Sequence, residues 1–158
     1  MALLSVSPPA YTALNNEITT AIAQGRISSP IRESEARALP YLQAVIRESL
    51  RLFPVPGELY KEVPAGGASV HNDRFFLPGG TWIGQNLYAM MRRRDLWGED
   101  AESFRPERWF LDTSNKKERF DAMAGMVDMG FGAGQFQCLG KVVAWMELNK
   151  AVVEVRKF

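Results

Sequence analysis

The sequence has few of the residues that several common classes of protein require. Its 158 residues include one cysteine and one histidine. A disulfide scaffold is therefore excluded, and so is a structural zinc site, which needs four nitrogen or sulfur ligands. Nineteen basic and eighteen acidic side chains leave a net charge of +1, which provides no positive field to attract nucleic acid. Because no run of about 18 apolar residues occurs, no transmembrane segment is predicted.

The composition is that of an ordinary folded domain. Hydrophobic residues make up 46% of the chain and charged residues 23%, which argues against wholesale disorder. The length allows one domain or a piece of a larger one. The opening stretch, Met1 to Val6, is too short for a signal peptide and lacks its basic flank. Apolar periodicity and clustered glycine and proline predict a mainly α-helical fold with small β-sheets, of the α+β class.

Six segments are expected along the chain. They are a helix at 8–25, a helix at 40–53, short strands within 58–84, an irregular meander at 94–128, a glycine-rich cysteine loop at 130–138 and a final helix at 139–156. The apolar face of the first helix is predicted to contain Tyr11, Leu14, Ile18 and Ile22. The buried stripe of the second is predicted to contain Leu42, Val45, Ile46, Leu50 and Phe53.

The most informative stretch is FGAGQFQCLG, residues 131–140, in which Cys138 lies where a glycine-rich loop leads into a helix. Glycine allows left-handed turns and lets backbone approach a large flat group closely. Free N–H groups at a helix N-terminus favour the thiolate over the thiol. Such a cysteine suits a nucleophile, a redox sensor or a metal ligand, whereas a lone cysteine is more often a small buried hydrophobe.

Two charged motifs accompany the loop. Within IRESLRLFP, Glu48 and Arg51 stand three residues apart on a predicted helix, so their charges share a face and can pair. Their apolar neighbours indicate a partly buried pair that needs further partners. Further along, FRPERW places Arg108 among aromatic residues. Each motif alone is equally compatible with ordinary solvated charges.

In this order and at these distances, the three motifs resemble the cytochrome P-450 haem-thiolate monooxygenases. The cysteine loop of that family has Phe, two residues, Gly, one residue, a basic residue, one residue, Cys, one residue and Gly. Four positions match this spacing: Phe131, Gly134, Cys138 and Gly140. The basic position, which usually contacts a haem propionate, is Phe136. The ending QCLGK is similar to fungal pisatin-demethylase-like members, in which an aromatic residue can occupy that position.

The resemblance implies that residues 1–158 form a partial domain, the C-terminal haem-binding part of the cytochrome P-450 fold. It implies haem, iron protoporphyrin, as the cofactor and Cys138 as the axial ligand of its iron. The other cofactor-binding residues carried over are Phe131, Gly134 and Gly140. Lys61 falls near a strand position that often carries a basic propionate contact, although a solvated lysine is the alternative interpretation.

The resemblance also assigns roles to the charged motifs and to partners. Glu48, Arg51 and Arg108 are expected to form one buried ionic cluster that holds the haem-side core. The activity implied is insertion of one oxygen atom from O2 into a small organic substrate. An electron-donating reductase is the expected partner of a full-length enzyme. If that enzyme is eukaryotic, the cytoplasmic side of the endoplasmic reticulum membrane is its expected location.

The part of the family that this chain resembles is the proximal, haem-ligand half. The oxygen-activating helix, with its acidic residue and threonine, would precede the first helix, so we expect the chain to lack it. No catalytic residue is therefore expected within the chain, which by itself should be incomplete and inactive. Its substrate is not readable from the residues present.

Alternatives stay open beside this interpretation. One is a non-catalytic haem-binding remnant or truncated gene product, which would bind haem without NADPH-linked turnover. Another is a reactive-cysteine hydrolase or redox protein, in which Cys138 would react without any haem absorbance. The only histidine, His71, is predicted in a surface turn between two strands. A dyad of Cys138 and His71 would also need an orienting group and an oxyanion site, for which the spacing gives no support.

Overall fold

The computed structural model describes three stretches of the chain: residues 7–55, 58–110 and 116–156. The expectation made for Met1 to Val6 lies outside them, as does the 111–115 part of the predicted meander. The described residues confirm the predicted fold class, because they form a mostly helical structure with two small antiparallel sheets. No helix within these stretches is both long enough and apolar enough to cross a bilayer.

The elements follow one another in a simple order. The α-helices are α2 (Pro8–Ala23), α3 (Glu33–Arg37), α4 (Pro40–Leu52), α5 (Leu87–Met90), α6 (Arg94–Trp97), α7 (Lys116–Asp128) and α8 (Lys141–Arg156). The strands are β1 (Glu58–Glu62), β2 (Ala68–Val70), β3 (Phe75–Leu77) and β4 (Trp82–Asn86). Short 3-10 turns are η1 (Pro106–Trp109), η2 (Met129–Phe131) and η3 (Gly134–Phe136).

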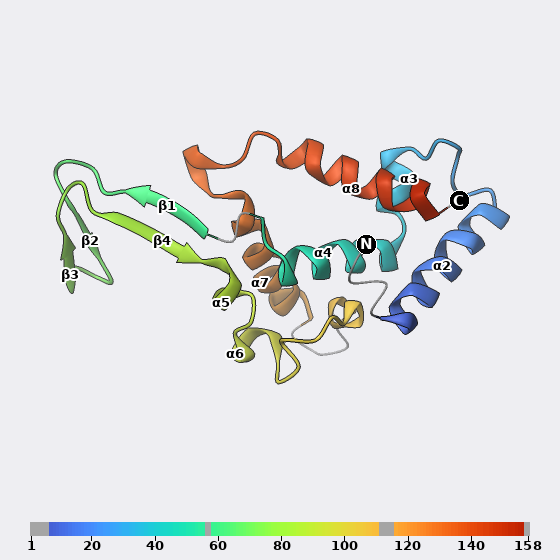
Figure 1. The fold of residues 1–158 in the computed structure, drawn as a ribbon, viewed down its shortest axis with the longest axis horizontal. Coiled ribbons are helices and arrows are strands. Elements are labelled where there is room, and N and C mark those ends of the chain that lie inside the picture. Colours follow the sequence, from blue (N-terminus) through green and yellow to red (C-terminus); the bar gives the residue numbers. More distant parts are fainter. Residues whose placement is uncertain (1–6, 56–57, 111–115, 157–158) are drawn as a thin grey trace.

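Helix α4 is the centre of the structure. Figure 1 shows α8 running above it, α2 to one side and the strands projecting at the opposite end. The apolar residues of α4 belong to two hydrophobic cores. Leu42, Val45 and Ile46 pack with residues of α2 and α8, whereas Ala44 packs with the tryptophans that follow α5. Phe53, expected on the buried stripe, is 53% exposed. It is the residue after the last helical turn, where φ −127° and ψ 72° turn its side chain away from the stripe.

The predicted apolar face of α2 was only half correct. Leu14 and Ile18 are buried, but the rest of the buried face consists of the alanines Ala10 and Ala21. Small side chains let neighbouring segments approach closely, which a search for large apolar residues overlooks. Tyr11 is instead 43% exposed and lies under a guanidinium group of α8, and Ile22 is 48% exposed.

A carboxylate on α2 fixes the start of α4. Glu17 accepts hydrogen bonds from the backbone N–H groups of Tyr41 and Leu42, at 2.8 and 2.9 Å. These N–H groups belong to the first turn of α4 and have no partner within the helix. The negative charge also lies at the positive end of the helix dipole. One side chain therefore both begins α4 and ties it to α2.

The strands form two separate ribbons. β1 pairs with β4, from Glu58 opposite Asn86 to Glu62 opposite Trp82. β2 pairs with β3, and the turn between them has three successive residues at positive φ: His71, Asn72 and Asp73. The first ribbon runs back toward the helices and carries β1 past the loop that precedes α8 (Figure 1).

The predicted meander at 94–128 needs correction, because it contains α6, η1 and the long helix α7. The sequence of α7 is polar overall and its outer face is exposed. Only Met123 and Val127 are buried, with Phe120 packed beside them. So narrow an apolar stripe gives a weak helical period, which is why sequence analysis missed it.

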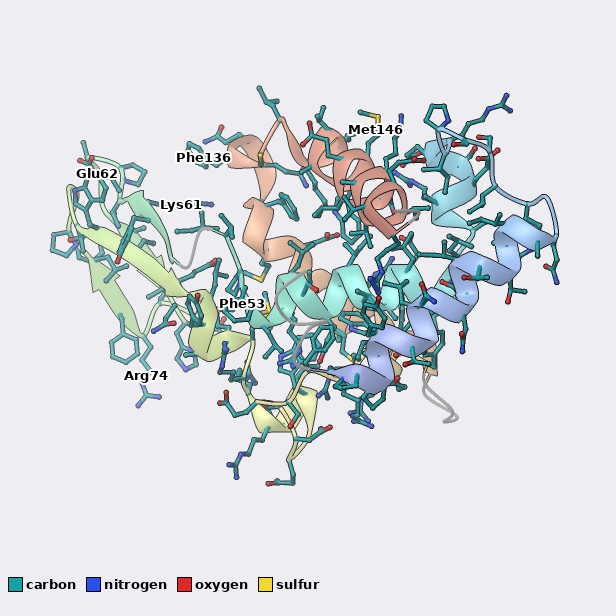
Figure 2. All side chains as sticks on the ribbon, turned by 45° about the vertical axis from the view of Figure 1, so that its right-hand side comes forward. Phe53, Lys61, Glu62, Arg74, Phe136 and Met146 are labelled. Atoms are coloured by element: carbon teal, nitrogen blue, oxygen red, sulfur yellow. The ribbon has the colours of Figure 1, made fainter. Side chains whose placement is uncertain are left out.

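The final helix also differs from its prediction. It begins at Lys141 rather than at residue 139, because the chain first turns at Leu139 and Gly140. Its buried residues, Asn149 and Val153, lie in its second half. The first half of α8 exposes an apolar face made up of Val142, Val143 and Met146, and Leu139 in the preceding turn is exposed as well. Figure 2 shows Met146 projecting outward from the helix.

Candidate functional site

The carboxylate of Glu48 lies at the centre of a fully buried ionic cluster. Arg51, one turn further along α4, donates to both of its oxygens at 2.9 and 3.0 Å. Arg108, sixty positions away in η1, donates from Nε to Glu48 Oε1 at 2.8 Å. The backbone N–H of Arg105 and the indole N–H of Trp109 complete its partners, at 3.0 and 3.1 Å. The structure thus brings together the three charged residues singled out in the sequence.

The two guanidinium groups also satisfy backbone carbonyls. Arg51 donates to the carbonyl oxygens of Met91, Ala101 and Ser103, at 2.7, 2.6 and 3.1 Å. Arg108 donates to those of Trp97, Asp100 and Ser103, at 2.8, 3.0 and 3.2 Å. These carbonyls belong to the ends of short helices, as at Met91 and Trp97, or to irregular backbone, where helix and strand bonds do not supply donors. The cluster therefore fastens the 91–108 segment onto α4.

Asp100 and Trp109 are members that the sequence analysis missed. Asp100 Oδ1 accepts from Arg108 at 3.2 Å and its carboxylate also pairs with Arg105. Burial opposes ionisation of Asp100, but the hydrogen bond and charge of Arg108 outweigh it and hold its pKa below the usual value. Asp100 thus adds a partly exposed carboxylate at the rim of the cluster, opposite Arg105 and Arg108. The only signal for Trp109 was its place directly after Arg108 in FRPERW.

The cysteine loop is shaped by two glycines with left-handed backbone. Gly132 has φ 76°, and a Cβ added there would lie 2.6 Å from the carbonyl oxygen of Phe136. Gly134 has φ 60° with open space around it, so its conformation rather than its surroundings favours glycine. The loop closes through a 2.7 Å hydrogen bond from the N–H of Cys138 to the carbonyl of Phe131.

The thiol of Cys138 is exposed and unpaired with any other cysteine, since the chain has only one. Gly140 leaves room beside it, because an added Cβ would stand 3.7 Å from the sulfur. Phe131, bonded through its backbone to Cys138, lines a hollow of about 390 Å³ with mostly apolar neighbours from α4 and α8. Its other lining residues are Leu50, Val55, Ala144, Glu147, Leu148 and Ala151.

Lys61 and Phe136 meet beside the loop. The ammonium nitrogen of Lys61, on β1, lies 5.0 Å from the centre of the Phe136 ring. Figure 2 shows Lys61 directed from the strand toward the loop that carries Phe136. Both residues are largely exposed. A positive charge from β1 thus stands next to the loop position where Phe136 itself provides none.

His71, the remaining candidate from the sequence, does not lie at the cysteine loop. His71 is exposed in the β2–β3 turn, where its ring lies 6.2 Å from that of Phe75, and it makes no contact with Cys138. Within the described residues no group of three His, Cys, Asp or Glu side chains is placed to hold a metal ion. A single sulfur donor is therefore what this part of the chain offers to a metal.

The sequence profile of the Cytochrome P450 family matches residues 1–155. The chain belongs to the cytochrome P450 family. Similar curated proteins are fungal cytochrome P450 monooxygenases. They include aba1 of Botryotinia fuckeliana, 44% identical over 150 residues, and ABA1 of Pyricularia oryzae, 43% identical over 158 residues. Another is ACRTS1 of Alternaria alternata, 42% identical over 159 residues.

These matches cover almost all of this chain but a minor part of each relative. The aligned regions take in 94%, 98% and 98% of the P450 chain described here, and 28%, 30% and 40% of the three relatives. The chain thus spans well under half the length of these curated relatives. Membership of the family accounts for the three motifs and their order, and haem is the cofactor that the family implies.

Proposed function

We propose that the chain is the proximal, haem-ligand part of a monooxygenase related to the fungal pisatin-demethylase-like enzymes, and that Cys138 is the axial ligand of the haem iron. The observation that carries the proposal is the exposed sulfur of Cys138 in a loop shaped by Gly132 and Gly134, beside an apolar hollow. The fungal P450 monooxygenases among the relatives support the subgroup.

The residues around Cys138 fit a haem in their chemistry. A macrocycle is flat and apolar, and the hollow next to the loop is lined mainly by carbon, with Phe131 as its aromatic wall. A cysteine thiolate is the soft donor that ferric and ferrous iron accept in this class of enzyme. When bound, a thiolate-ligated haem supplies the activation of O2 that monooxygenation requires.

Each residue of the chain then has a distinct task. Cys138 donates its sulfur, and Phe131 holds the backbone N–H of Cys138 while its ring faces the hollow. Gly134 and Gly140 keep the loop free of side chains that would stand between backbone and cofactor. We assign Lys61 to a propionate carboxylate, because its ammonium lies beside Phe136, where a basic loop residue is missing. The cluster around Glu48 holds the segment after α5 onto α4.

The whole enzyme would insert one oxygen atom into a small organic substrate with electrons from a reductase partner, at the cytoplasmic face of the endoplasmic reticulum. These assignments rest on the family, because the chain spans only 28% to 40% of the relatives compared. A short haem-binding product without turnover is the second candidate.

The test of the ligand is optical. The chain is reconstituted with haem, reduced and exposed to carbon monoxide, and the Soret band is recorded. Thiolate ligation gives a strongly red-shifted band that histidine ligation does not. We expect Cys138→Ser to abolish the shifted band and His71→Ala, which removes the only histidine, to leave it unchanged. Loss of haem in His71→Ala but not in Cys138→Ser would refute the assignment.

A graded test addresses the propionate. Replacing Phe136 by Arg should slow haem loss to an acceptor such as apomyoglobin if a propionate lies beside that position. Lys61→Gln should speed the loss, while Lys117→Gln on the far end of α7 removes the same charge and serves as the matched control. If Lys61→Gln and Lys117→Gln release haem at the same rate, Lys61 has no part in holding it. If a full-length version of the protein takes up no haem, a reactive-cysteine protein becomes the better account.

A further inference from the structure

A second cavity, separate from the apolar hollow beside Phe131, lies among four helices. It has a volume of about 450 Å³, within the range of small-molecule sites in proteins. Its walls come from α3, α4, α7, the loop residue Gln137 and α8 as far as Asn149, and α4 contacts each of the other three helices (Figure 1). The side chains that line it are Arg37, Gln43, Arg47, Ala124, Val127, Asp128, Gln137, Lys141, Val142, Trp145 and Asn149.

The lining carries an excess of positive charge. It contains three basic side chains against one carboxylate, Asp128. That carboxylate is already engaged, because it pairs with Lys141 at 3.0 Å. Arg37 pairs with Glu33 of its own helix. Arg47 alone makes no ion pair among the described residues.

Arg47 is held in place by aromatic rings instead of by a counter-charge. Its guanidinium carbon lies 5.5 Å from the rings of Phe120 and Trp145 and 5.9 Å from that of Trp109. Its one hydrogen bond to the protein is a long one, 3.4 Å, to the carbonyl of Gln43. Burial lowers the pKa of Arg47, with Asp128 opposing that effect. Among the described residues Arg47 has the through-space attraction of Asp128 but no direct ion pair, so an anion that arrives from outside would stabilise this half-buried, pre-oriented cation.

A buried amide gives a second, independent indication. Asn149 is 1% exposed and lines the same cavity. Its oxygen accepts from Gln43 Nε2 at 2.6 Å, but its own Nδ2 has no acceptor. Buried donors are nearly always satisfied, so an unpaired one calls for an acceptor. Within the described stretches, Asn149 Nδ2 thus has no acceptor and the Arg47 guanidinium has a single long one, so both have donors to offer to an acceptor oxygen in the cavity.

We propose that this cavity binds a small multivalent oxyanion, whose phosphate or carboxylate oxygens accept from the Arg47 guanidinium and from Asn149. The planar fork of an arginine suits two such oxygens at once. Trp145 and Val127 offer an apolar wall, so the anion can carry an organic body. Cys138 itself does not line this cavity, although its neighbour Gln137 does.

The test uses the full chain and two probes, inorganic pyrophosphate and citrate, titrated at constant ionic strength. Binding is followed by NMR of the ¹⁵N-labelled chain at Arg47 Nε and the side-chain amide of Asn149. We expect saturable shifts at both groups, with pyrophosphate and citrate telling phosphate from carboxylate preference. Arg47→Gln should weaken binding by about tenfold or more, the effect of losing one charged hydrogen-bonding partner.

Two variants make the result decisive. Arg94→Gln removes the same charge from an exposed residue of α6 and should change binding by less than about twofold. Asn149→Asp keeps the shape of the side chain but brings a carboxylate into the cavity, so it should abolish binding of both probes while the chain stays folded. Equal weakening by Arg47→Gln and Arg94→Gln, unaltered binding in Asn149→Asp, or no saturable shift with either probe would each overturn the proposal.

Discussion

Removing the Arg51 guanidinium should behave as a lesion of the core, although Arg51 is a charged residue. In Arg51→Ala, Glu48 stays buried with Arg108 as its only remaining cation, and the carbonyls of Met91 and Ala101 lose their donor. Breaking a buried ion pair by removing one partner costs about 3–5 kcal/mol. Because a domain of this kind has about 5–15 kcal/mol of stability in total, the variant should be severely destabilised.

The assay is urea unfolding followed by tryptophan fluorescence, with the midpoint compared at constant slope. Arg105→Ala is the matched control, since Arg105 is half exposed and its side chain pairs with the rim carboxylate Asp100. We expect it to lose no more than about 1 kcal/mol. If Arg51→Ala does not fold, Arg51→Lys provides a milder test. It keeps the charge but loses the fork, and should cost about 1–3 kcal/mol through unsatisfied carbonyls.

The reasoning fails if Arg51→Ala and Arg105→Ala unfold at the same midpoint. That result would mean that the carboxylate of Glu48 is solvated or satisfied without Arg51, contrary to its position at 0% exposure. An Arg51→Lys variant as stable as the parent would refute the same prediction, because the three donors of a lysine ammonium cannot replace the five donors of the planar arginine guanidinium.

Two further predictions concern backbone and pH. Gly132→Ala should destabilise the chain by about 1–3 kcal/mol, because Gly132 has a positive φ and an added Cβ would lie close to the carbonyl of Phe136. Gly125 lies in α7 with open space around it, so Gly125→Ala should stabilise the chain by about 0.5–1 kcal/mol in the same unfolding assay. Equal effects of the two substitutions would refute this. Hydrogen bonds from the Ser28 and Arg32 backbone and from the Ser28 hydroxyl lower the pKa of Glu35 from 4.5 to about 2. Its contribution to stability should therefore be complete above pH 4.5 and disappear as the pH falls toward 2, and Glu35→Gln should lose that part of the acid dependence in a pH series of melting temperatures. An unchanged acid dependence would show that the Ser28 contacts do not persist in solution.

Sequence analysis predicted what depends on strong local patterns. The apolar periodicity of residues 42–50 predicted helix α4, and the clustered proline and glycine residues predicted the turns of the two ribbons. The helical spacing predicted that Glu48 and Arg51 could pair, and the family resemblance added Arg108; all three meet in the structure. Family membership explains this success, because the order of three motifs holds information that no single motif has.

The features that were missed depend on long-range contacts. Helix α7 is stabilised by Phe120, Met123 and Val127 packing onto the tryptophan core, and not by its own periodicity. The alanine face of α2 exists only because its neighbours come close. The meeting of Lys61 with Phe136 requires the register of β1 against β4 together with the path of the loop, neither of which is visible in the chain.

The ionic cluster and the cysteine loop are connected through α4. The carbonyls of Met91 and Trp97 lie at helix ends without a helix or strand donor, so Arg51 and Arg108 act as their hydrogen-bond donors. The cluster thereby fixes α4 against this segment. Leu50, the residue before Arg51, lies in the wall of the hollow that Phe131 completes. The cluster that fixes α4 thus also fixes the position of Leu50 in the hollow that contains Phe131, whose carbonyl accepts from the N–H of Cys138.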